Sequence, residues 1–457
     1  MINVVIQGLG YVGAATALTI ASKLGKNKKP IFNVIGVERK NNVISKKLID
    51  NINSKIFPHK SNNTQVKSLL KKIENNNNLI ATDDIEYFSK ADVIIISINF
   101  DFKDKNFRDF KLDAFKKSVE DIAINITENT LLIVQSTVPP GTTEKIVLPI
   151  LVKILKRRGL NHKKIYLSHS FERVMPGDNY MESITNNWRV YAGINKISEQ
   201  KCKNFLSKII NIKEFPLTRL NNPTESEICK LLENSFRAVN IAFIDEWLRF
   251  TERLNLNLFD IINAIRKRPT HKNIMLPGLG VGGYCIPKDP LITKVAAEKI
   301  FNFKDLKFPM SVKAASINKK MPDFTFEIIK KICKKVKINK ILLMGVSYKD
   351  NVGDTRYSAA ERLFRKLDKS KFKILLHDPL VKKWRETNKI VNTKIPDIKL
   401  IQLMVFLVKH KQFNYINFEK LKKRNKNLFI IDANNVLSKK QILKINKLNI
   451  KNYILGK

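Results

Sequence analysis

The feature that most constrains this chain is a glycine-rich turn directly after its first apolar segment. Residues 3–6 form a short apolar run, and Gly8, Gly10 and Gly13 follow it in the pattern G-x-G-x-x-G. The first glycine of such a pattern permits a tight turn, the second lets a pyrophosphate approach the backbone, and the third lets a helix pack closely on the strand. The turn therefore predicts a strand–turn–helix unit whose helix N-terminus binds the phosphates of a dinucleotide.

A carboxylate stands where such a unit binds the ribose. Glu38 ends the next expected strand, residues 34–37, and its carboxylate is suited to hold the ribose hydroxyls. Arg39 follows directly, and an arginine at this place can accept a 2′-phosphate. These residues therefore leave NAD and NADP open, and a tight turn without any ligand is the alternative for the glycine pattern alone.

Short apolar runs alternate with amphipathic segments through the first half of the chain. Strands are expected at residues 3–6, 34–37, 93–98, 131–134 and 164–167, and helices at 14–24, 66–72 and 112–126. This alternation predicts a parallel, doubly wound sheet. Residues 223–256 contain no turn signal and predict one long helix, and a second strand–helix series is expected after Pro322.

We therefore predict an α/β protein with two Rossmann-like doubly wound parallel-sheet domains. A helical domain with a long connector helix is expected to join them. The predicted boundaries are residues 1–215 for a dinucleotide-binding domain, 216–322 for the helical domain and 323–457 for the second sheet domain.

Composition argues against several other classes of protein. The chain holds 84 Lys and Arg against 41 Asp and Glu, a net charge of +43, but these cations are dispersed and do not form the basic stripe of a nucleic-acid-binding protein. The four cysteines show no C-x-x-C pairing, so neither a disulfide framework nor a zinc site is expected. The apolar runs are shorter than a membrane span and no signal peptide is evident, so a cytoplasmic location is expected.

The sharpest chemical signal is a cysteine in the run GVGGYCIPKD at residues 280–289. Glycines before Cys285 remove side-chain bulk, so a substrate carbon and a nicotinamide ring have room beside the sulfur. Lys288 would favour the thiolate, and Asp289 lies close enough in sequence to orient a water or take part in proton transfer. An isolated cysteine is otherwise a small buried hydrophobe, which is the interpretation we give Cys202, Cys229 and Cys333.

A polar stripe runs along the expected long helix. Glu227, Lys230, Asn234 and Arg237 are spaced to share one face, opposite apolar side chains. A solvated face is the alternative, but the asparagine and the arginine favour a binding face on which Lys230 takes part in proton transfer.

Together these segments resemble the UDP-glucose/GDP-mannose dehydrogenase family of nucleotide-sugar 6-dehydrogenases over essentially the whole chain. The matching motifs are GLGYVG (8–13), STVPPGTT (136–143), FERVMPG (171–177), KLLENSFRAVNIAF (230–243), GVGGYCIPKDP (280–290) and GVSYKDNVGDTRYS (345–358). The resemblance implies a four-electron oxidation of a sugar C6 alcohol to a carboxylate with two NAD molecules. Cys285 would form a thiohemiacetal and then a thioester, which water cleaves.

The resemblance also assigns roles to residues of this chain, and no metal is implied. The implied catalytic residues are Cys285, Lys230, Asn234, Asp289, Glu172 and Thr137. The implied cofactor-binding residues are Gly8, Gly10, Tyr11, Val12, Gly13, Glu38, Thr137, Lys288 and Arg356. The implied substrate-binding residues are Glu172, Arg173, Val174, Lys230, Asn234, Arg237, Arg268, His271, Gly282 and Lys349. For Lys349 and Arg356, a local salt bridge with Asp350 or Asp354 is the alternative.

Residues 171–177 and 237–240 resemble the branch that acts on UDP-N-acetylhexosamines. We therefore expect UDP-N-acetylglucosamine or UDP-N-acetylmannosamine as the substrate, a role in surface polysaccharide synthesis, and a homodimer or larger assembly paired through the long helix. The same chemistry on UDP-glucose or GDP-mannose, a two-electron hydroxyacid dehydrogenase and a basic nucleic-acid-binding protein are the alternatives. Phe171, Tyr284 and Lys288 depart from the usual family residues, which leaves the exact sugar open.

Overall fold

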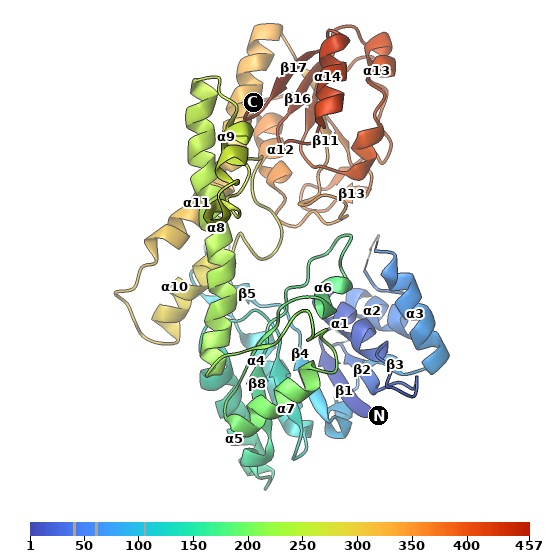
Figure 1. Ribbon diagram of the computed structural model, residues 1–457, viewed down its shortest axis with the longest axis vertical. Coiled ribbons are helices and arrows are strands. Elements are labelled where there is room, and N and C mark those ends of the chain that lie inside the picture. Colours follow the sequence, from blue (N-terminus) through green and yellow to red (C-terminus); the bar gives the residue numbers. More distant parts are fainter. Residues whose placement is uncertain (40–42, 60–62, 105–106) are drawn as a thin grey trace. The chain divides into compact units, whose positions relative to one another are not determined.

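The protein forms two compact units, each built around its own sheet (Figure 1). The computed structural model describes residues 1–39, 43–59, 63–104 and 107–457. The first unit holds Met1–Leu232 and Ile292–Lys307, and the second holds Glu233–Leu291 and Phe308–Lys457. Within the described ranges, no helix has both the length and the apolar character that a membrane crossing requires.

An eight-stranded sheet forms the core of the first unit. Its strands are β1 (Ile2–Gln7), β2 (Phe32–Val37), β3 (Leu79–Thr82), β4 (Val93–Ile96), β7 (Leu131–Val134), β8 (Tyr166–His169), β9 (Val190–Gly193) and β10 (Thr218–Arg219). The spatial order is β10-β9-β8-β7-β4-β1-β2-β3. In this spatial order, the neighbours β8, β7, β4, β1, β2 and β3 are all parallel, whereas β9 runs antiparallel to β8. The predicted doubly wound parallel sheet is confirmed, with a reversed pair of strands at one edge.

Helices cover both faces of this sheet. One face packs against α1 (Tyr11–Ala21), α2 (Val43–Asn53), α3 (Gln65–Asn76) and α7 (Lys196–Leu206), and the other against α4 (Asp113–Asn125) and α5 (Leu148–Arg157). Side chains alternate along a strand, so Val4 and Ile6 enter one core while Val5 enters the other. Burial on both faces explains why the strands are continuous apolar runs.

A five-stranded parallel sheet forms the core of the second unit. Its strands are β11 (Lys340–Met344), β12 (Lys373–His377), β15 (Leu403–Phe406), β16 (Phe429–Asp432) and β17 (Lys451–Ile454), in the order β12-β11-β15-β16-β17. One face packs on α11 (Pro309–Val336) and α12 (Ala359–Lys369), and the other on α13 (Phe418–Arg424) and α14 (Lys439–Lys447). The order changes direction between β11 and β15, and such switch points are where open α/β sheets bind ligands.

The predicted long helix is confirmed as α8 (Pro223–Arg253), which contributes residues to both units. It is followed by α9 (Leu258–Ile265) and α10 (Asp289–Lys299). The second strand–helix series expected after Pro322 begins with β11, and Pro322 itself lies inside α11. The helix continues through it because buried residues on either side, such as Met321 and Phe326, keep one apolar face in the core.

Candidate functional site

The glycine turn of the first unit has the geometry of a phosphate-binding loop. Gly8 follows β1 with a φ of 96°, and a Cβ at Gly13 would lie 1.9 Å from the Gly8 carbonyl oxygen. Gly10 is the N-cap of α1, makes no side-chain cap, and has open space where a Cβ would stand. The turn and the helix N-terminus that follows it have the arrangement that suits an anionic ligand such as the pyrophosphate of a dinucleotide.

The ribose-binding carboxylate lies beside this turn. Glu38 follows β2, and its carboxylate accepts hydrogen bonds from the backbone N–H of Leu9 at 2.7 Å and of Arg39 at 3.2 Å. Burial raises the pKa of Glu38, and these two N–H groups oppose that rise. Thr137 follows β7, at the carboxyl edge of the same sheet. The first unit thus presents the glycine turn, Glu38 and Thr137 along one edge of its sheet, whereas Lys288 and Arg356 belong to the second unit.

A cation-rich cluster follows β8 in the first unit. Phe171 is fully buried, and both Arg173 and Lys230 lie over its ring, with the charged atoms 4.9 and 5.4 Å from the ring centroid. Lys230 also donates to the Glu172 carbonyl oxygen at 2.9 Å, while the Glu172 carboxylate accepts from the Val174 N–H. The phenylalanine that replaces the usual proline therefore supports both cations through cation–π contacts.

Glu227 has a role that sequence analysis did not identify. Its side chain is buried and accepts hydrogen bonds from the backbone N–H of Gly141 at 2.6 Å and from the backbone N–H and hydroxyl of Thr143 at 2.8 and 2.6 Å. Burial raises the pKa of Glu227 to about 8. Of the four polar residues predicted to share one face of α8, Glu227 thus anchors the loop that begins at Thr137.

In the second unit, Cys285 is exposed at the end of its glycine-rich loop. The two preceding glycines are required by Tyr348: a Cβ at Gly282 or Gly283 would approach the Tyr348 side chain to 2.8 or 2.7 Å. The space at these glycines is therefore filled by the protein itself, which is a different reason for them than the room for substrate that we predicted. The close packing fixes the loop that presents the sulfur.

Asp289 is the centre of a buried hydrogen-bond network below this cysteine. Its carboxylate accepts from the Asn234 amide at 2.7 Å and from the Lys288 ammonium at 2.7 Å, and its backbone N–H donates to the Cys285 carbonyl oxygen at 2.9 Å. Asp289 and Lys288 are almost fully buried, and Lys288 also lies over the Tyr284 ring. The charge of Lys288 is thus balanced by its neighbour, and the Asp289 side chain lies between the Asn234 amide and the loop that carries Cys285.

The other predicted residues of the second unit are more dispersed. Arg356 forms the local salt bridge that we gave as its alternative, with its guanidinium 2.7 Å from Asp354. Arg268 and His271 are exposed around a short 3₁₀ turn, Pro269–His271, and Arg237 is half-buried on α8. No further chemistry follows from the positions of these residues within the unit.

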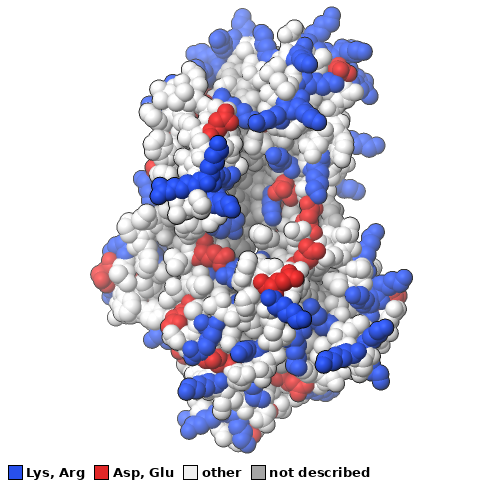
Figure 2. Space-filling view, viewed as in Figure 1, with Lys and Arg blue, Asp and Glu red and all other residues white. Residues whose placement is uncertain are grey.

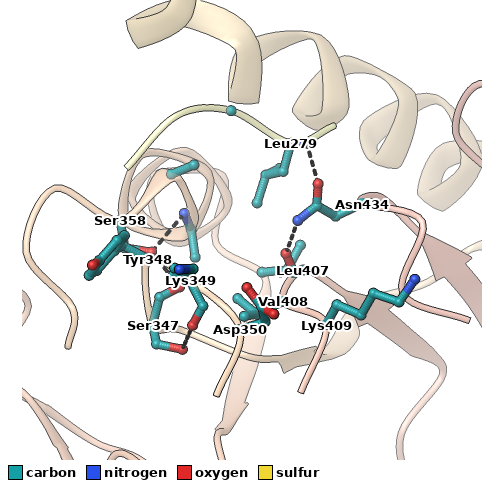
Figure 3. Close-up of a pocket in the computed structure, with 13 residues that line it drawn as sticks. Leu279, Ser347, Tyr348, Lys349, Asp350, Ser358, Leu407, Val408, Lys409 and Asn434 are labelled. Atoms are coloured by element: carbon teal, nitrogen blue, oxygen red, sulfur yellow. Dashed lines mark hydrogen bonds between the residues drawn. The ribbon is translucent and has the colours of Figure 1, made fainter. Parts of the chain in front are cut away.

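Lys349 lines a pocket of about 160 Å³ in the second unit (Figure 3). The lining residues are Leu279, Gly280, Ser347, Tyr348, Lys349, Asp350, Ser358, Ala359, Ala360, Leu407, Val408, Lys409 and Asn434. Eight of them, at residues 347–350, 407–409 and 434, follow the carboxyl ends of β11, β15 and β16, so the pocket lies at the switch point of the sheet. Figure 3 shows Asn434 joining two of its walls, through the Leu279 N–H and the Leu407 carbonyl oxygen.

A second buried carboxylate supports the floor of this pocket. Asp378 accepts from the backbone N–H of Val346 and Ser347 at 2.9 and 3.1 Å and contacts His410 Nε2 at 3.1 Å. Burial acts to raise the pKa of Asp378, but the contact with His410 and the backbone N–H groups hold it below its ordinary value. Sequence analysis missed Asp378, although it follows β12 as Glu38 follows β2.

Basic side chains are spread over the visible face of each unit (Figure 2). On the face drawn in Figure 2, Lys and Arg side chains are scattered over each unit, with acidic side chains among them. This agrees with the dispersed charge of the sequence and gives no support to a nucleic-acid interface.

Family models match the chain in three consecutive segments. They are the NAD binding domain of the UDP-glucose/GDP-mannose dehydrogenase family at residues 2–211, its central domain at 224–320 and its UDP binding domain at 342–439. These ranges follow the order of the three predicted domains.

Full-length relatives are dehydrogenases of UDP-sugars. The chain is 31% identical over 459 residues to the UDP-N-acetyl-D-mannosamine dehydrogenase of Methanocaldococcus jannaschii, covering 99% of this chain and 96% of that one. It is 30% identical to the enzyme of the same name from Campylobacter jejuni, covering 92% and 98%. A solved UDP-D-ManNAc dehydrogenase from Pyrococcus horikoshii superposes with a TM-score of 0.82 at 25% identity, covering 100% and 99%.

Replacing Glu227 with Gln should change how the stability of the protein depends on pH. The folded protein holds a proton on Glu227 up to about pH 8, whereas the unfolded chain releases it near 4.5. The free energy of unfolding of the wild type should therefore fall, relative to Glu227→Gln, by up to roughly 1 kcal/mol per pH unit as the pH rises through this window. Urea denaturation at several pH values measures the difference.

Glu246→Gln is the matched control, because Glu246 is exposed on the same helix. The free energy of unfolding of this control should change with pH as that of the wild type does. If the free energies of unfolding of the wild type and Glu227→Gln differed by the same amount at every pH, the assignment of a protonated carboxyl group would be contradicted.

Proposed function

This chain belongs to the UDP-glucose/GDP-mannose dehydrogenase family and is an NAD-dependent nucleotide-sugar dehydrogenase, and from that premise we propose that it oxidises the C6 alcohol of UDP-N-acetyl-D-mannosamine to the uronate. The observation that carries the proposal is the exposed Cys285 above the buried carboxylate of Asp289. The sugar is suggested by the names of the M. jannaschii and C. jejuni relatives. UDP-N-acetylglucosamine is the alternative, and a role in supplying uronates for surface polysaccharide belongs to the same proposal.

The first unit is suited to hold NAD. We assign the pyrophosphate to the N-terminus of α1, where Gly10 leaves space beside the backbone, and the ribose hydroxyls to the Glu38 carboxylate. When bound, NAD supplies the hydride acceptor for both oxidations of C6. The protein's own residues must then hold the sugar, manage its protons and form the covalent intermediate.

Cys285 forms that intermediate in the proposed mechanism. Its thiolate adds to the C6 aldehyde, and the carbonyl oxygen takes a proton to give a thiohemiacetal. The second oxidation removes a hydride from C6 and the hydroxyl proton, which leaves a thioester. Water adds to the thioester, the carbon–sulfur bond breaks, and the carboxylate and the thiolate are released. The full reaction consumes one water and transfers four electrons.

Lys230 and Asp289 manage the protons in this scheme. The Lys230 ammonium has three N–H groups and uses one on the Glu172 carbonyl oxygen, so it has donors to offer a substrate oxygen. Asp289 is held by Asn234 and Lys288, which fixes its orientation as a group that positions the hydrolytic water. We also assign to Glu172 and Thr137 the positioning of water that the family resemblance implies for them.

We assign the UDP moiety to the second unit, whose family model is the UDP binding domain. We assign Lys349 and Lys409, which line the pocket at the switch point, to the phosphate oxygens. The Asn434 amide would contact a polar edge of the UDP moiety. Its position outside the carboxyl ends of parallel strands is where such sheets bind nucleotides.

We also propose that two copies of the chain pair through α8. One side of this helix exposes large apolar side chains along its length, and the residue after its end continues the row: Ile228, Leu232, Phe236, Phe243, Trp247, Phe250 and then Leu254. Their spacing of three, four or seven residues keeps them on one face, and exposed apolar patches of this kind mark interfaces between proteins.

Replacing Cys285 with Ser should abolish uronate formation, because the hydroxyl is a far weaker nucleophile than the thiolate. A loss of kcat by several orders of magnitude is expected, as for nucleophiles of other enzymes. The measurement is NADH release together with the amount of uronate. Cys229→Ser on α8 is the matched control and should keep activity, whereas full uronate yield from Cys285→Ser would exclude the covalent mechanism.

A panel of nucleotide sugars tests the substrate. UDP-N-acetylmannosamine should give the highest kcat/KM, with two NADH formed for each uronate. If UDP-N-acetylglucosamine, UDP-glucose or GDP-mannose gave a higher kcat/KM, that sugar would be the substrate instead of the proposed one. One NADH per turnover would instead indicate a two-electron dehydrogenase.

Trp247→Glu should dissociate the proposed dimer, because it places a charge in an apolar interface. Sedimentation velocity should show a dimer for the wild type and a smaller species for the variant. Tyr415→Glu is the control, since Tyr415 is 87% exposed on the short helix Lys411–Tyr415. A monomeric wild type would overturn the proposed pairing.

A further inference from the structure

Arg39 occupies the place from which an arginine can bind the 2′-phosphate of NADP, yet the chain belongs to an NAD-dependent family. It directly follows Glu38, whose carboxylate is the ribose acceptor of the proposed function. A cation beside the ribose would ordinarily favour the cofactor with the additional phosphate. Some other feature of the first unit must therefore act against NADP.

Asp121 on α4 engages this arginine. Arg39 Nη2 lies 2.6 Å from Asp121 Oδ2, and the two side chains are 31% and 11% exposed. Asp121 is fixed because its neighbours Val119 and Ile122 are buried in the core between α4 and the sheet. A short, charge-assisted bond to a fixed and largely buried carboxylate neutralises the guanidinium and directs it toward α4.

We propose that Asp121 is a specificity-determining residue that excludes NADP by holding Arg39 on α4. To bind a 2′-phosphate, Arg39 would have to leave Asp121, and a largely buried carboxylate would lose one of its partners. Lys117, one turn earlier, is 3.1 Å from the other carboxylate oxygen but is more than half exposed. It would therefore only weakly offset the loss of the contact between Arg39 and Asp121. The carboxylate would also repel a phosphate group directly.

Glu38 and Asp121 thus act on different parts of the cofactor. Glu38 favours NAD by accepting hydrogen bonds from the ribose hydroxyls, whereas Asp121 removes the cation that NADP would use. The inference rests on the proposed placement of the ribose at Glu38. It does not depend on the sugar substrate or on Cys285.

Asp121→Asn tests the inference, because the amide keeps the shape of the side chain and removes its charge. The probes are adenosine 2′,5′-bisphosphate and adenosine 5′-monophosphate, which differ only in the 2′-phosphate. Calorimetry should show that the variant improves the affinity ratio in favour of the bisphosphate by roughly tenfold, the scale of one charge-assisted contact. The kcat/KM ratio of NADP to NAD should rise in parallel.

Two further variants identify the group responsible. Adding Arg39→Ala to Asp121→Asn should return the affinity ratio to the wild-type value, because the binding cation is gone. Glu120→Gln removes the same charge from the neighbouring position of α4 and should leave the ratio unchanged. If Asp121→Asn does not fold, Asp121→Ser provides the same comparison.

An unchanged ratio in the folded Asp121 variants would overturn the inference, as would a gain that persists without Arg39. Neither result would affect the proposed function, which fails only if the wild type does not oxidise nucleotide sugars with NAD. Binding of the two adenosine phosphates reports on Asp121 even in that case.

Discussion

Helix α8 is hydrogen-bonded to the functional loops through two buried acidic side chains. In the first unit, Glu227 on α8 accepts three hydrogen bonds from the loop that ends in Thr143. In the second unit, Asn234 on α8 donates to Asp289, which in turn fixes the start of α10 and the cysteine loop. Buried acidic groups are costly unless they are hydrogen-bonded, which favours the arrangement in which these contacts are made. The positions of the reactive side chains follow from these contacts.

Local patterns were sufficient to predict most of the fold. The strands are buried on both faces and the long helix has no internal turn signal, so β1, β4, β7, β11 and α8 could be located from apolar runs and periodicity alone. The continuation of α11 through Pro322 carries no local signal, because a proline ordinarily disfavours a helix interior and the packing of the residues around it decides the outcome. The reversal of β9 could not be foreseen either, since strand direction depends on contacts distant in sequence.

The candidate site was predictable where residues close in sequence form it. Gly8, Gly10 and Cys285 stand in compact motifs, and their chemistry follows from those motifs. The partners of these residues come from remote segments and left no local signal: Tyr348 against the glycines of the cysteine loop, Phe171 under Lys230, and Asp121 beside Arg39. Long-range pairing converts a recognisable motif into a working arrangement, and a single sequence does not reveal it.

The contact between Tyr348 and the cysteine loop has a consequence for the evolution of this protein. A methyl group at Gly282 or Gly283 would collide with the tyrosine, and Gly283 also has a left-handed φ of 84°. Substitutions in the glycine-rich loop and at Tyr348 are therefore not independent of each other. The nearest atoms to a Cβ at Gly283 belong to the Tyr348 ring, so a homologue with a larger residue at position 283 should carry a smaller one at position 348, although more than sixty residues separate them. A Cβ at Gly282 would instead meet the Cβ of Tyr348 and the backbone oxygen of Tyr357, so glycine should persist there.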